Sequence, residues 1–314
     1  MRFLSLFVIL TGCIDYSVSR RYITDSFVQP SRSAGVDILW VIDDSASMFE
    51  EQDQLSSHAN SFIGYLSLTP VDFQLAVTTT DVSVDAPGGF LGDILTPETP
   101  DLATAFADQI YLDEGSRDEK GFEAALAALD LDGVNGEVLR SSADLELIFF
   151  SDEDDQSDYS VEEFVNGLLS ARPVTNVVVN AIVGDPPEGC ASIFGAADAG
   201  DKYRQAQSQT DGIRESICSL DYDEMLSRVA LKVLGLDNTV SLTEAPDLDT
   251  MTVRVDDALI YRRDRHGWSY DAGSNAIIFD GYAVPPPGAE VVIKYAKWIG
   301  PRDGYKQQED EETE

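Results

Sequence analysis

Mostly apolar runs alternate with segments of helical periodicity along the first two thirds of this chain. Four runs predict strands that are buried on both faces: residues 36–42, 73–80, 145–150 and 174–183. Between and after them, apolar residues recur with the spacing of one helix face: residues 48–68, 120–129, 160–170, 201–210 and 221–235. Proline and glycine residues within 87–100 interrupt regular secondary structure and predict a long irregular region. This alternation favours an α/β domain at 35–236 with a doubly wound, mostly parallel, Rossmann-like sheet.

The pattern changes near residue 238 to short strands separated by turn signals. Residues 250–255, 276–279 and 290–295 are the predicted strands, and Pro285-Pro286-Pro287-Gly288 marks a turn between the last two. We therefore expect a small antiparallel β module at 237–299. Residues 300–314 are rich in Asp and Glu and predict a disordered, solvating tail.

The first residues have the features of an export signal. Met1-Arg2 is followed by an apolar stretch at 3–10 that is too short to span a bilayer as a mature helix. Leu10-Thr11-Gly12-Cys13 resembles the bacterial lipobox, in which the cysteine is acylated. The resemblance implies a signal peptide at 1–12 and a lipid anchor and polar tether at 13–34. It places the chain in the bacterial cell envelope, held to the bilayer through acylated Cys13. The alternative is an ordinary signal with an incidental cysteine.

Two small details refine that expectation. Ile14 follows the cysteine, where an aspartate often signals inner-membrane retention in such lipoproteins, so the outer membrane is favoured. Once Cys13 is acylated, Cys190 and Cys218 remain as an even pair in an oxidising compartment, and we expect a disulfide between them.

Charge excludes several partners. The chain has 21 Lys and Arg against 57 Asp and Glu, a net charge of −36. Nucleic acid and anionic lipid headgroups would be repelled, so no nucleic-acid partner is expected. Its two histidines, His58 and His266, lie far apart in the sequence, and no zinc site is visible.

The end of the first predicted strand carries the main candidate chemistry. Residues 36–42 lead directly into Asp43-Asp44-Ser45-Ala46-Ser47, which has the pattern Asp-x-Ser-x-Ser. Carboxylate and hydroxyl oxygens are hard donors that suit Mg²⁺ or a similar cation. Ligands of open α/β sheets bind at the carboxyl ends of strands. A plain helix cap by Ser45 or Ser47 is the alternative interpretation.

Motif and placement together resemble the metal-ion-dependent adhesion site of the von Willebrand factor type A domain. The resemblance implies a three-segment site: Asp43, Ser45, Ser47, Ser116 and Asp152. Ser116 stands where the family has threonine, and Asp118 or Glu119 could contribute instead. Mg²⁺ is the expected ion, with Ca²⁺ or Mn²⁺ possible. One coordination position would stay open for a carboxylate from a protein partner.

The segment after Asp152 departs from the family pattern. Glu153, Asp154 and Asp155 replace the usual glycine and its neighbours, and carboxylates turned toward the ion would favour Ca²⁺. We expect at least Asp155 to face solvent. Residues 152–163 also match the ligand spacing of an EF-hand, but Ser157 occupies the glycine position and a strand precedes the loop.

A narrower resemblance, to bacterial type A lipoproteins with a C-terminal β extension, rests on several further segments: Ser151-Asp152-Glu153-Asp154-Asp155, Gly189-Cys190, Tyr203, Gly212, Ser216-Ile217-Cys218, Gly267-Trp268-Ser269-Tyr270-Asp271, Asn275-Ala276-Ile277-Ile278-Phe279 and Pro286-Pro287-Gly288. It implies a membrane-anchored extracytoplasmic binding or adhesion protein. The alternative is a structural envelope lipoprotein without functional metal dependence. An enzyme is not expected, because no nucleophile and base accompany the site.

Overall fold

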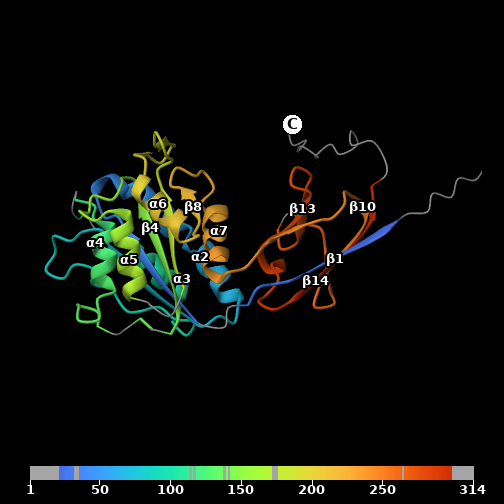
Figure 1. Ribbon diagram of the computed structural model, residues 1–314, viewed down its shortest axis with the longest axis horizontal. Helices are drawn as coiled ribbons and strands as arrows, with labels where there is room; N and C mark the ends of the chain where they lie inside the picture. The colour runs from blue at the N-terminus through green and yellow to red at the C-terminus, as the bar shows by residue number, and fades with distance from the viewer. Residues whose placement is uncertain are drawn as a thin grey trace, which may run out of the picture.

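The computed structural model describes residues 21–31, 35–112, 115, 118–136, 139–140, 142–171, 176–263 and 265–298. Figure 1 shows an α/β domain beside a smaller β module. The predicted signal peptide, the lipidation site Cys13 and the acidic segment 300–314 lie outside the described residues. Within the described ranges, no helix is both long and apolar enough to cross a membrane.

The sheet of the α/β domain has five parallel strands in the order β3-β2-β4-β5-β8. Their bounds are β2 Val36–Ile42, β3 Phe73–Thr79, β4 Asp144–Ser151, β5 Val177–Val183 and β8 Arg214–Ser216. The central strand β2 is buried along its whole length, as its largely apolar composition predicts, and its one charged residue, Asp37, is buried too. Trp40 in β2 lies opposite Val77 on one side and Ile148 on the other.

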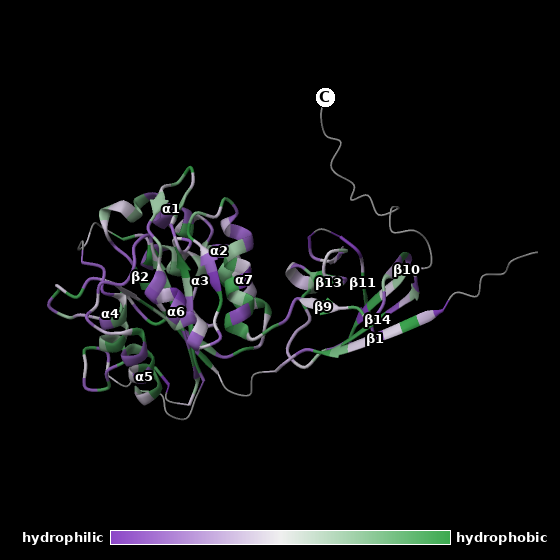
Figure 2. Cartoon of the chain, turned by 45° about the horizontal axis from the view of Figure 1, so that its top comes forward, coloured by the Kyte–Doolittle hydropathy of each residue, from purple (hydrophilic) through white to green (hydrophobic). Residues whose placement is uncertain are grey.

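Helices cover both faces of this sheet. On one face pack α1 Phe49–Ser57, α2 Ala59–Leu68, α3 Leu102–Ile110 and α7 Tyr222–Leu234. The other face is covered by α4 Gly121–Ala128, α5 Val161–Ala171 and α6 Asp201–Gln209. Figure 2 shows hydrophobic and hydrophilic residues mixed along the helices that surround the sheet, as expected of helices with one buried face. This architecture confirms the predicted doubly wound α/β fold.

Two helical details differ from the sequence prediction. The expected single helix at 48–68 begins with a 3-10 turn, Ala46–Met48, and is then divided into α1 and α2 at His58, whose φ is −106°. Helix α3 lies in the region predicted to be irregular. Its nine residues follow closely on Pro97 and Pro100, so the breakers masked a short helical pattern.

The β module consists of two antiparallel sheets around a core of their inward-facing residues. One sheet has the order β1-β14-β10-β11: Tyr22–Val28, Glu290–Lys297, Pro246–Val255 and Ala258–Ile260. The other has the order β12-β13-β9: Trp268–Asp271, Ala276–Phe279 and Thr239–Ser241. A 3-10 turn, Gly281–Ala283, follows β13, and a two-stranded ribbon, β6 Cys190–Ala191 with β7 Ala196–Ala197, belongs to the α/β domain.

Strand β1 corrects the expectation that residues 13–34 are a tether. Tyr22–Val28 pairs along its whole length with β14, so the module includes a strand from the start of the described chain. The strand was missed because its central inward position is Asp25, which is buried. Its carboxylate accepts hydrogen bonds from Thr243 Oγ1 (2.8 Å) and Tyr295 Oη (2.8 Å), which compensate its burial.

Polar contacts order the part of the module that lies next to the α/β domain. The amide Nε2 of Gln29 donates to the carbonyls of Asp237 and Pro285, both at 2.9 Å. The Gly281 N–H donates to Tyr65 Oη on α2 (2.9 Å). The first two bonds tie the residue after β1 to the segment that enters the module and to the loop before β14, and the third joins the turn after β13 to α2 of the α/β domain.

Candidate metal centre

The candidate site lies at the topological switch point of the sheet. From β2 the chain crosses to β3 on one side, and β4 follows on the other side, so the connections diverge between β2 and β4. Crevices at such points, outside the carboxyl ends of the strands, are where open α/β sheets bind ligands. Asp43 directly follows β2, and Asp152 directly follows β4.

The Asp-x-Ser-x-Ser segment forms a tight turn after β2. Asp43 N–H donates to Phe150 O (2.9 Å), which extends the pairing of the two strands by one residue. Asp43 is fully buried, and its Oδ1 accepts from Ser45 N–H (2.9 Å). The hydroxyl oxygens of Ser45 and Ser47 lie 2.9 Å apart. The turn thus gathers two hydroxyls next to a buried carboxylate.

Asp152 meets this turn from the neighbouring strand. Ser47 Oγ lies 3.4 Å from Asp152 Oδ1, and Asp152 N–H points to Met48 Sδ (3.2 Å). Ser151 Oγ donates to Asp43 Oδ2 (2.6 Å), so the two strand ends are also joined through the first carboxylate. The structure therefore brings together four of the five predicted metal-site residues.

The fifth residue, Ser116, lies outside the described residues. Its neighbour Gly115 is described, and its N–H donates to Asp44 O at 2.7 Å. A Cβ atom at Gly115 would lie 2.1 Å from the Asp44 carboxylate, so this close approach requires glycine. Residue 115 thus lies against the Asp-x-Ser-x-Ser turn, and Ser116 as a ligand stays a prediction.

Glu119, one of the two residues offered as substitutes for Ser116, lies close to the site. It is almost completely buried, and Gln156 Nε2 donates to its carboxylate. Burial raises the pKa of Glu119 to about 8, and the charge of Asp43 adds to the increase. A buried carboxylate so close to other acidic groups is a natural additional oxygen donor.

Burial and like charges raise the pKa values of the other carboxylates of the site. The pKa of Asp152 rises to about 7, first through burial and then through the charge of Asp43. Burial also raises the pKa of Asp43, although the hydrogen bond from Ser151 opposes it. Asp44, beside Asp81, has a pKa of about 6 because of its burial and that neighbouring charge. Among the described residues, no ion pair with a Lys or Arg compensates these carboxylates.

Sequence reasoning missed Glu51 on helix α1. The side chain is buried, and its Oε2 has no hydrogen-bond partner among the described residues, as is also true of Asp44 Oδ1. Its signal was available: Met48, Glu51, Gln52 and Leu55 follow the i, i+3, i+4, i+7 spacing of one buried helix face. Two polar residues on such a face indicate a polar site beneath the helix.

The carboxylates after Asp152 divide into two groups. The expectation that Asp155 faces solvent is wrong. Asp155 is buried, accepts from Phe122 N–H (2.9 Å) and pairs with Lys202 Nζ (3.3 Å). Asp154 accepts from Lys202 N–H (2.8 Å). Both therefore anchor the starts of α4 and α6. Only Glu153, which accepts from Gln156 (3.0 Å), adds charge on the side of Glu119.

The EF-hand interpretation is wrong, because strand β4 and not a helix precedes this loop. In the described part of the chain, no three Asp, Glu, His or Cys side chains converge closely enough to hold a metal ion by themselves. A metal at this site would therefore need the serine hydroxyls. Hydroxyl and carboxylate oxygens fit Mg²⁺, Mn²⁺ or Ca²⁺ better than zinc. Carboxylate oxygens that are buried close to other acidic groups and have no hydrogen-bond partner among the described residues, such as Asp44 Oδ1 and Glu51 Oε2, likewise fit a cation.

A cavity of about 220 Å³ adjoins the serine turn. It is lined by Asp44, Ser45, Ala46, Phe49, Gln52 and Leu112. Phe49 is 60% exposed and packs edge-on against Tyr111, at a centroid distance of 6.2 Å. The polar site thus has an accessible apolar border.

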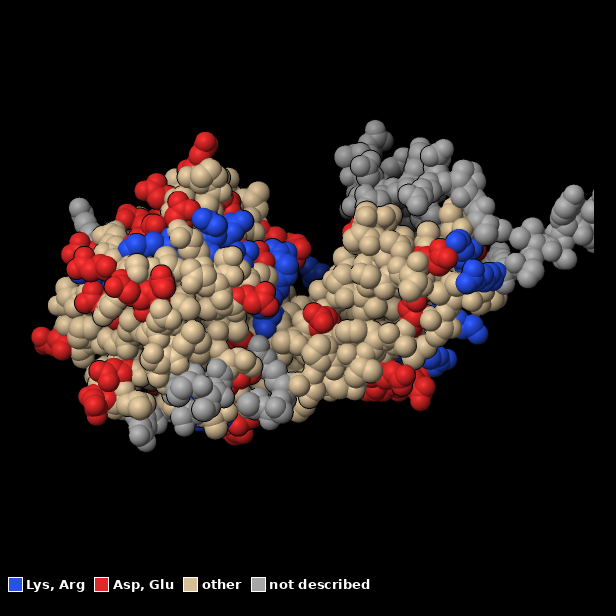
Figure 3. Space-filling model, in the orientation of Figure 1, with Lys and Arg blue, Asp and Glu red and all other residues tan. Residues whose placement is uncertain are grey.

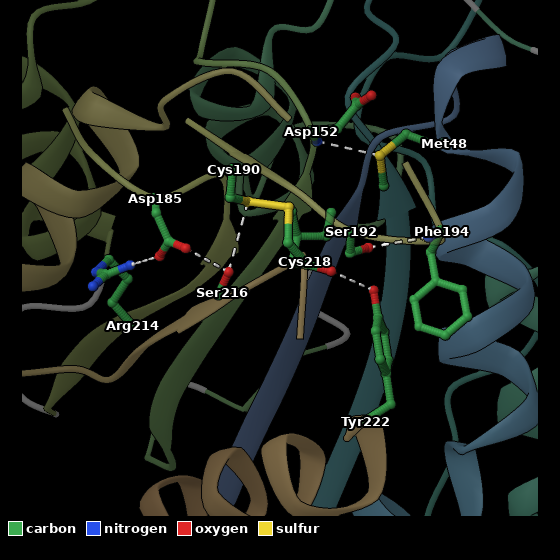
Figure 4. Close-up of a disulfide and its surroundings, with 11 residues drawn as sticks. Met48, Asp152, Asp185, Cys190, Ser192, Phe194, Arg214, Ser216, Cys218 and Tyr222 are labelled. Carbon is green, nitrogen blue, oxygen red and sulfur yellow. Dashed lines mark hydrogen bonds and ion pairs between the residues drawn. A yellow bond between two sulfur atoms is a disulfide. The ribbon is translucent and has the colours of Figure 1, made fainter. Parts of the chain in front are cut away.

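The predicted disulfide is confirmed and lies next to the site (Figure 4). Cys190 and Cys218 are bonded, with their Cα atoms 6.1 Å apart. Between them, Asp198 N–H donates to Asp152 O (2.7 Å), and a Cβ at Gly195 would lie 2.2 Å from Glu51 Oε1. The disulfide-closed segment therefore packs directly against two acidic residues of the site.

No protein-family model and no curated protein matches this chain. Solved structures show a distant likeness. The pilus adhesin SpaC of Lactobacillus rhamnosus GG is 12% identical with a TM-score of 0.48, over 91% of this chain and 41% of that one. A von Willebrand factor type A protein of Catenulispora acidiphila is 12% identical with a TM-score of 0.41, over 90% and 67%.

Manganese-loaded TRAP protein of Plasmodium vivax is 12% identical with a TM-score of 0.42, over 79% of this chain and 93% of that one. This chain spans less than half of the SpaC chain. Sheet order, helices on both faces and the Asp-x-Ser-x-Ser turn at the switch point define a von Willebrand factor type A-like fold.

Proposed function

We propose that this chain is a lipid-anchored extracytoplasmic binding or adhesion protein that engages a protein partner through a bound divalent cation. The observation that carries the proposal is the convergence of Ser45, Ser47, Asp43 and Asp152 at the switch point of the sheet. Four hard oxygen donors from two strand ends meet where this fold class binds ligands.

The donor chemistry favours a bound cation that can still bind an anion from a partner. Ser45 and Ser47 supply neutral hydroxyls, and Ser116 would supply a third. Neutral ligands leave more of the ion's positive charge uncompensated than carboxylates would. Such an ion, when bound, would attract a carboxylate from a partner. Asp43 accepts from the Ser45 backbone N–H and so fixes the turn, and Asp152 accepts from the Ser47 hydroxyl.

The proposed location rests on two sequence signals and one structural feature. The lipobox-like segment that ends at Cys13 favours a lipoprotein. Position 14 is isoleucine and not aspartate, which favours the outer membrane. The disulfide between Cys190 and Cys218 is of the kind that persists in oxidising compartments. Divalent cations and partner proteins are both available there.

Titration of the mature, metal-free chain with Mg²⁺, Mn²⁺ and Ca²⁺ by calorimetry tests the metal site. We expect one site, which is lost in the double variant S45A/S47A. The matched control is Ser67→Ala. Ser67 lies on α2, and its hydroxyl donates to Ile63 O within the same helix, so it takes no part in the metal site. Absence of binding at millimolar concentrations of all three ions would instead favour a structural envelope protein that uses the same fold without metal.

A pull-down of envelope proteins with the mature chain tests the binding function itself. Capture should depend on Mg²⁺, fall on addition of EDTA, and fall equally in Asp43→Ala. Unchanged capture after either treatment would contradict metal-mediated binding, even if the calorimetry had shown an intact metal site.

A further inference from the structure

A group of exposed arginines and tyrosines lies on the β module of this acidic chain. The residues are Tyr261, Arg262, Arg263, Arg265 and Tyr282, which we call the Arg–Tyr surface. Tyr261 is 61% and Tyr282 is 72% exposed, and all three arginines are exposed. The ion pairs within the described ranges use other Lys and Arg residues, so these three guanidinium groups have no described acidic partner.

Ring stacking orders this surface. The Arg263 guanidinium lies 5.5 Å from the centroid of the Tyr261 ring, and the His266 ring lies 4.5 Å from that of Tyr282. His266 Nδ1 accepts from Tyr282 N–H (3.3 Å), which fixes the second pair. Side chains that are already held in place lose less conformational entropy when a ligand binds.

Between the two stacked pairs lies a small cavity of about 140 Å³. Its lining adds Leu259, Ile260 and Ala283 to Tyr261, Arg263, His266 and Tyr282. Cavities for drug-sized ligands measure roughly 300–1,000 Å³, so this one holds a single side chain. Tyr and Arg are the residues that dominate protein–protein binding energy. Guanidinium groups bind carboxylates in a bidentate manner. The surface therefore fits an acidic peptide with an aromatic or apolar residue.

The chain itself contains such a peptide. Residues 301–314 include Tyr305 and end in the run Glu309-Asp310-Glu311-Glu312-Thr313-Glu314. The α/β domain does not attract it, because residues 35–236 contain 39 Asp and Glu against 9 Lys and Arg. Figure 3 shows acidic side chains spread over that domain. The Arg–Tyr surface offers the opposite charge on the module from which the segment emerges.

Chain length allows the contact. The described chain ends at Trp298, beside Ala245 and one residue beyond β14. Strand β14 has eight residues and is about 27 Å long. The twelve residues 299–310 can span about 40 Å when extended. The acidic run can therefore reach any point along the module.

We propose that the acidic segment 301–314 binds the Arg–Tyr surface of its own chain. Tethering through a short linker gives the segment an effective concentration on the order of millimolar. Even a weak contact is then occupied most of the time, and any outside partner of this surface must displace the segment first. The proposal does not depend on the metal site.

Fluorescence anisotropy of a labelled synthetic peptide of residues 301–314 tests this proposal. The peptide should bind a chain that ends at Trp298, and binding should weaken at least tenfold in R262Q/R263Q/R265Q. The matched control, R254Q/K294Q/K297Q, removes the same charge elsewhere on the module and should change binding less than threefold. Tyr282→Ser, a second variant that keeps all charges, should weaken binding about threefold.

Comparison with the full-length chain tests the intramolecular contact. Its own tail should compete, so the labelled peptide should bind the full-length chain several-fold more weakly than the chain ending at Trp298. Equal binding to both would overturn the proposal. So would equal loss in the two triple variants, or equal binding of a peptide whose acidic residues are replaced by Asn and Gln. Polygalacturonate binding at this surface without peptide binding would assign it to acidic saccharides.

Discussion

Replacing Asp152 by Asn should stabilise the metal-free protein and at the same time abolish its stabilisation by Mg²⁺. The substitution keeps the shape of the side chain but removes one charge from a buried group of carboxylates. Asp152 is only 4% exposed, and burial together with the charge of Asp43 raises its pKa from 3.8 to about 7. Without a cation, the ionised form of this side chain is therefore unfavourable in the folded state.

The sign and size of the effect follow from proton linkage. Because the folded-state pKa is raised, the folded protein binds more protons than the unfolded chain between pH 3.8 and about 7. Stability of the metal-free protein is thus lost as pH rises through this window. From pH 5 to pH 7 the loss due to Asp152 is about 2 kcal/mol, at 1.36 kcal/mol per pH unit and with allowance for relaxation. For a domain of this size that corresponds to roughly 4–8 °C in Tm.

Thermal unfolding at pH 5 and pH 8, with EDTA or with saturating Mg²⁺, measures both effects. In EDTA at pH 8 the Asn variant should unfold several degrees above the wild type, and at pH 5 the gap should shrink. Mg²⁺ at 100 times its Kd should stabilise the wild type by about 2.7 kcal/mol and leave the variant nearly unchanged. The control is Asp158→Asn, an exposed residue of the same loop, which should change neither value. A variant that is less stable without metal, or that keeps the full Mg²⁺ shift, would refute this reasoning.

Three further predictions concern the surroundings of the site. Asp155→Ala leaves Phe122 N–H without its acceptor and removes the ion pair of Lys202, which keeps only its bond to Ser157 O among the described contacts, so the unfolding free energy in urea should fall by about 2–4 kcal/mol; a loss below about 0.5 kcal/mol would be inconsistent with the anchoring role. Replacing both Cys190 and Cys218 by Ser should lower stability by about 3 kcal/mol through loop entropy, and unchanged denaturation curves would contradict this. Association with an acidic partner should become faster as salt screens the negative domain, whereas a slower on-rate in stopped-flow at higher salt would count against it.

The central part of the fold could be predicted because its signals are local. The runs at 36–42 in β2 and 145–150 in β4 are apolar except for Asp37 and Glu146, and parallel strands buried on both faces have that largely apolar composition. The helix predicted from residue 160 begins with a capping box, in which Ser160 N–H donates to Glu163 Oε2 (2.8 Å) and Glu163 N–H to Ser160 Oγ (3.2 Å). Both features depend on residues close in sequence.

The errors arose where distant residues decide the environment of a side chain. Asp25 looked like part of a polar tether, but Thr243 and Tyr295, over 200 residues away, make it acceptable inside a sheet. Asp155 looked like surface charge, but the start of α4 and Lys202 on α6 provide its partners. Sequence patterns show that a residue is polar; they do not show which donors the fold brings to it.

Anomalous diffraction from crystals of the mature chain soaked in Mn²⁺ tests the central claim most directly. We predict one manganese peak at the carboxyl ends of β2 and β4, within about 2.5 Å of the Ser45 and Ser47 hydroxyl oxygens. Electron density for Ser116 in that crystal would show at the same time whether it is the third hydroxyl ligand. An empty switch point at a saturating Mn²⁺ concentration, or a peak only elsewhere on the acidic surface, would contradict the proposed site.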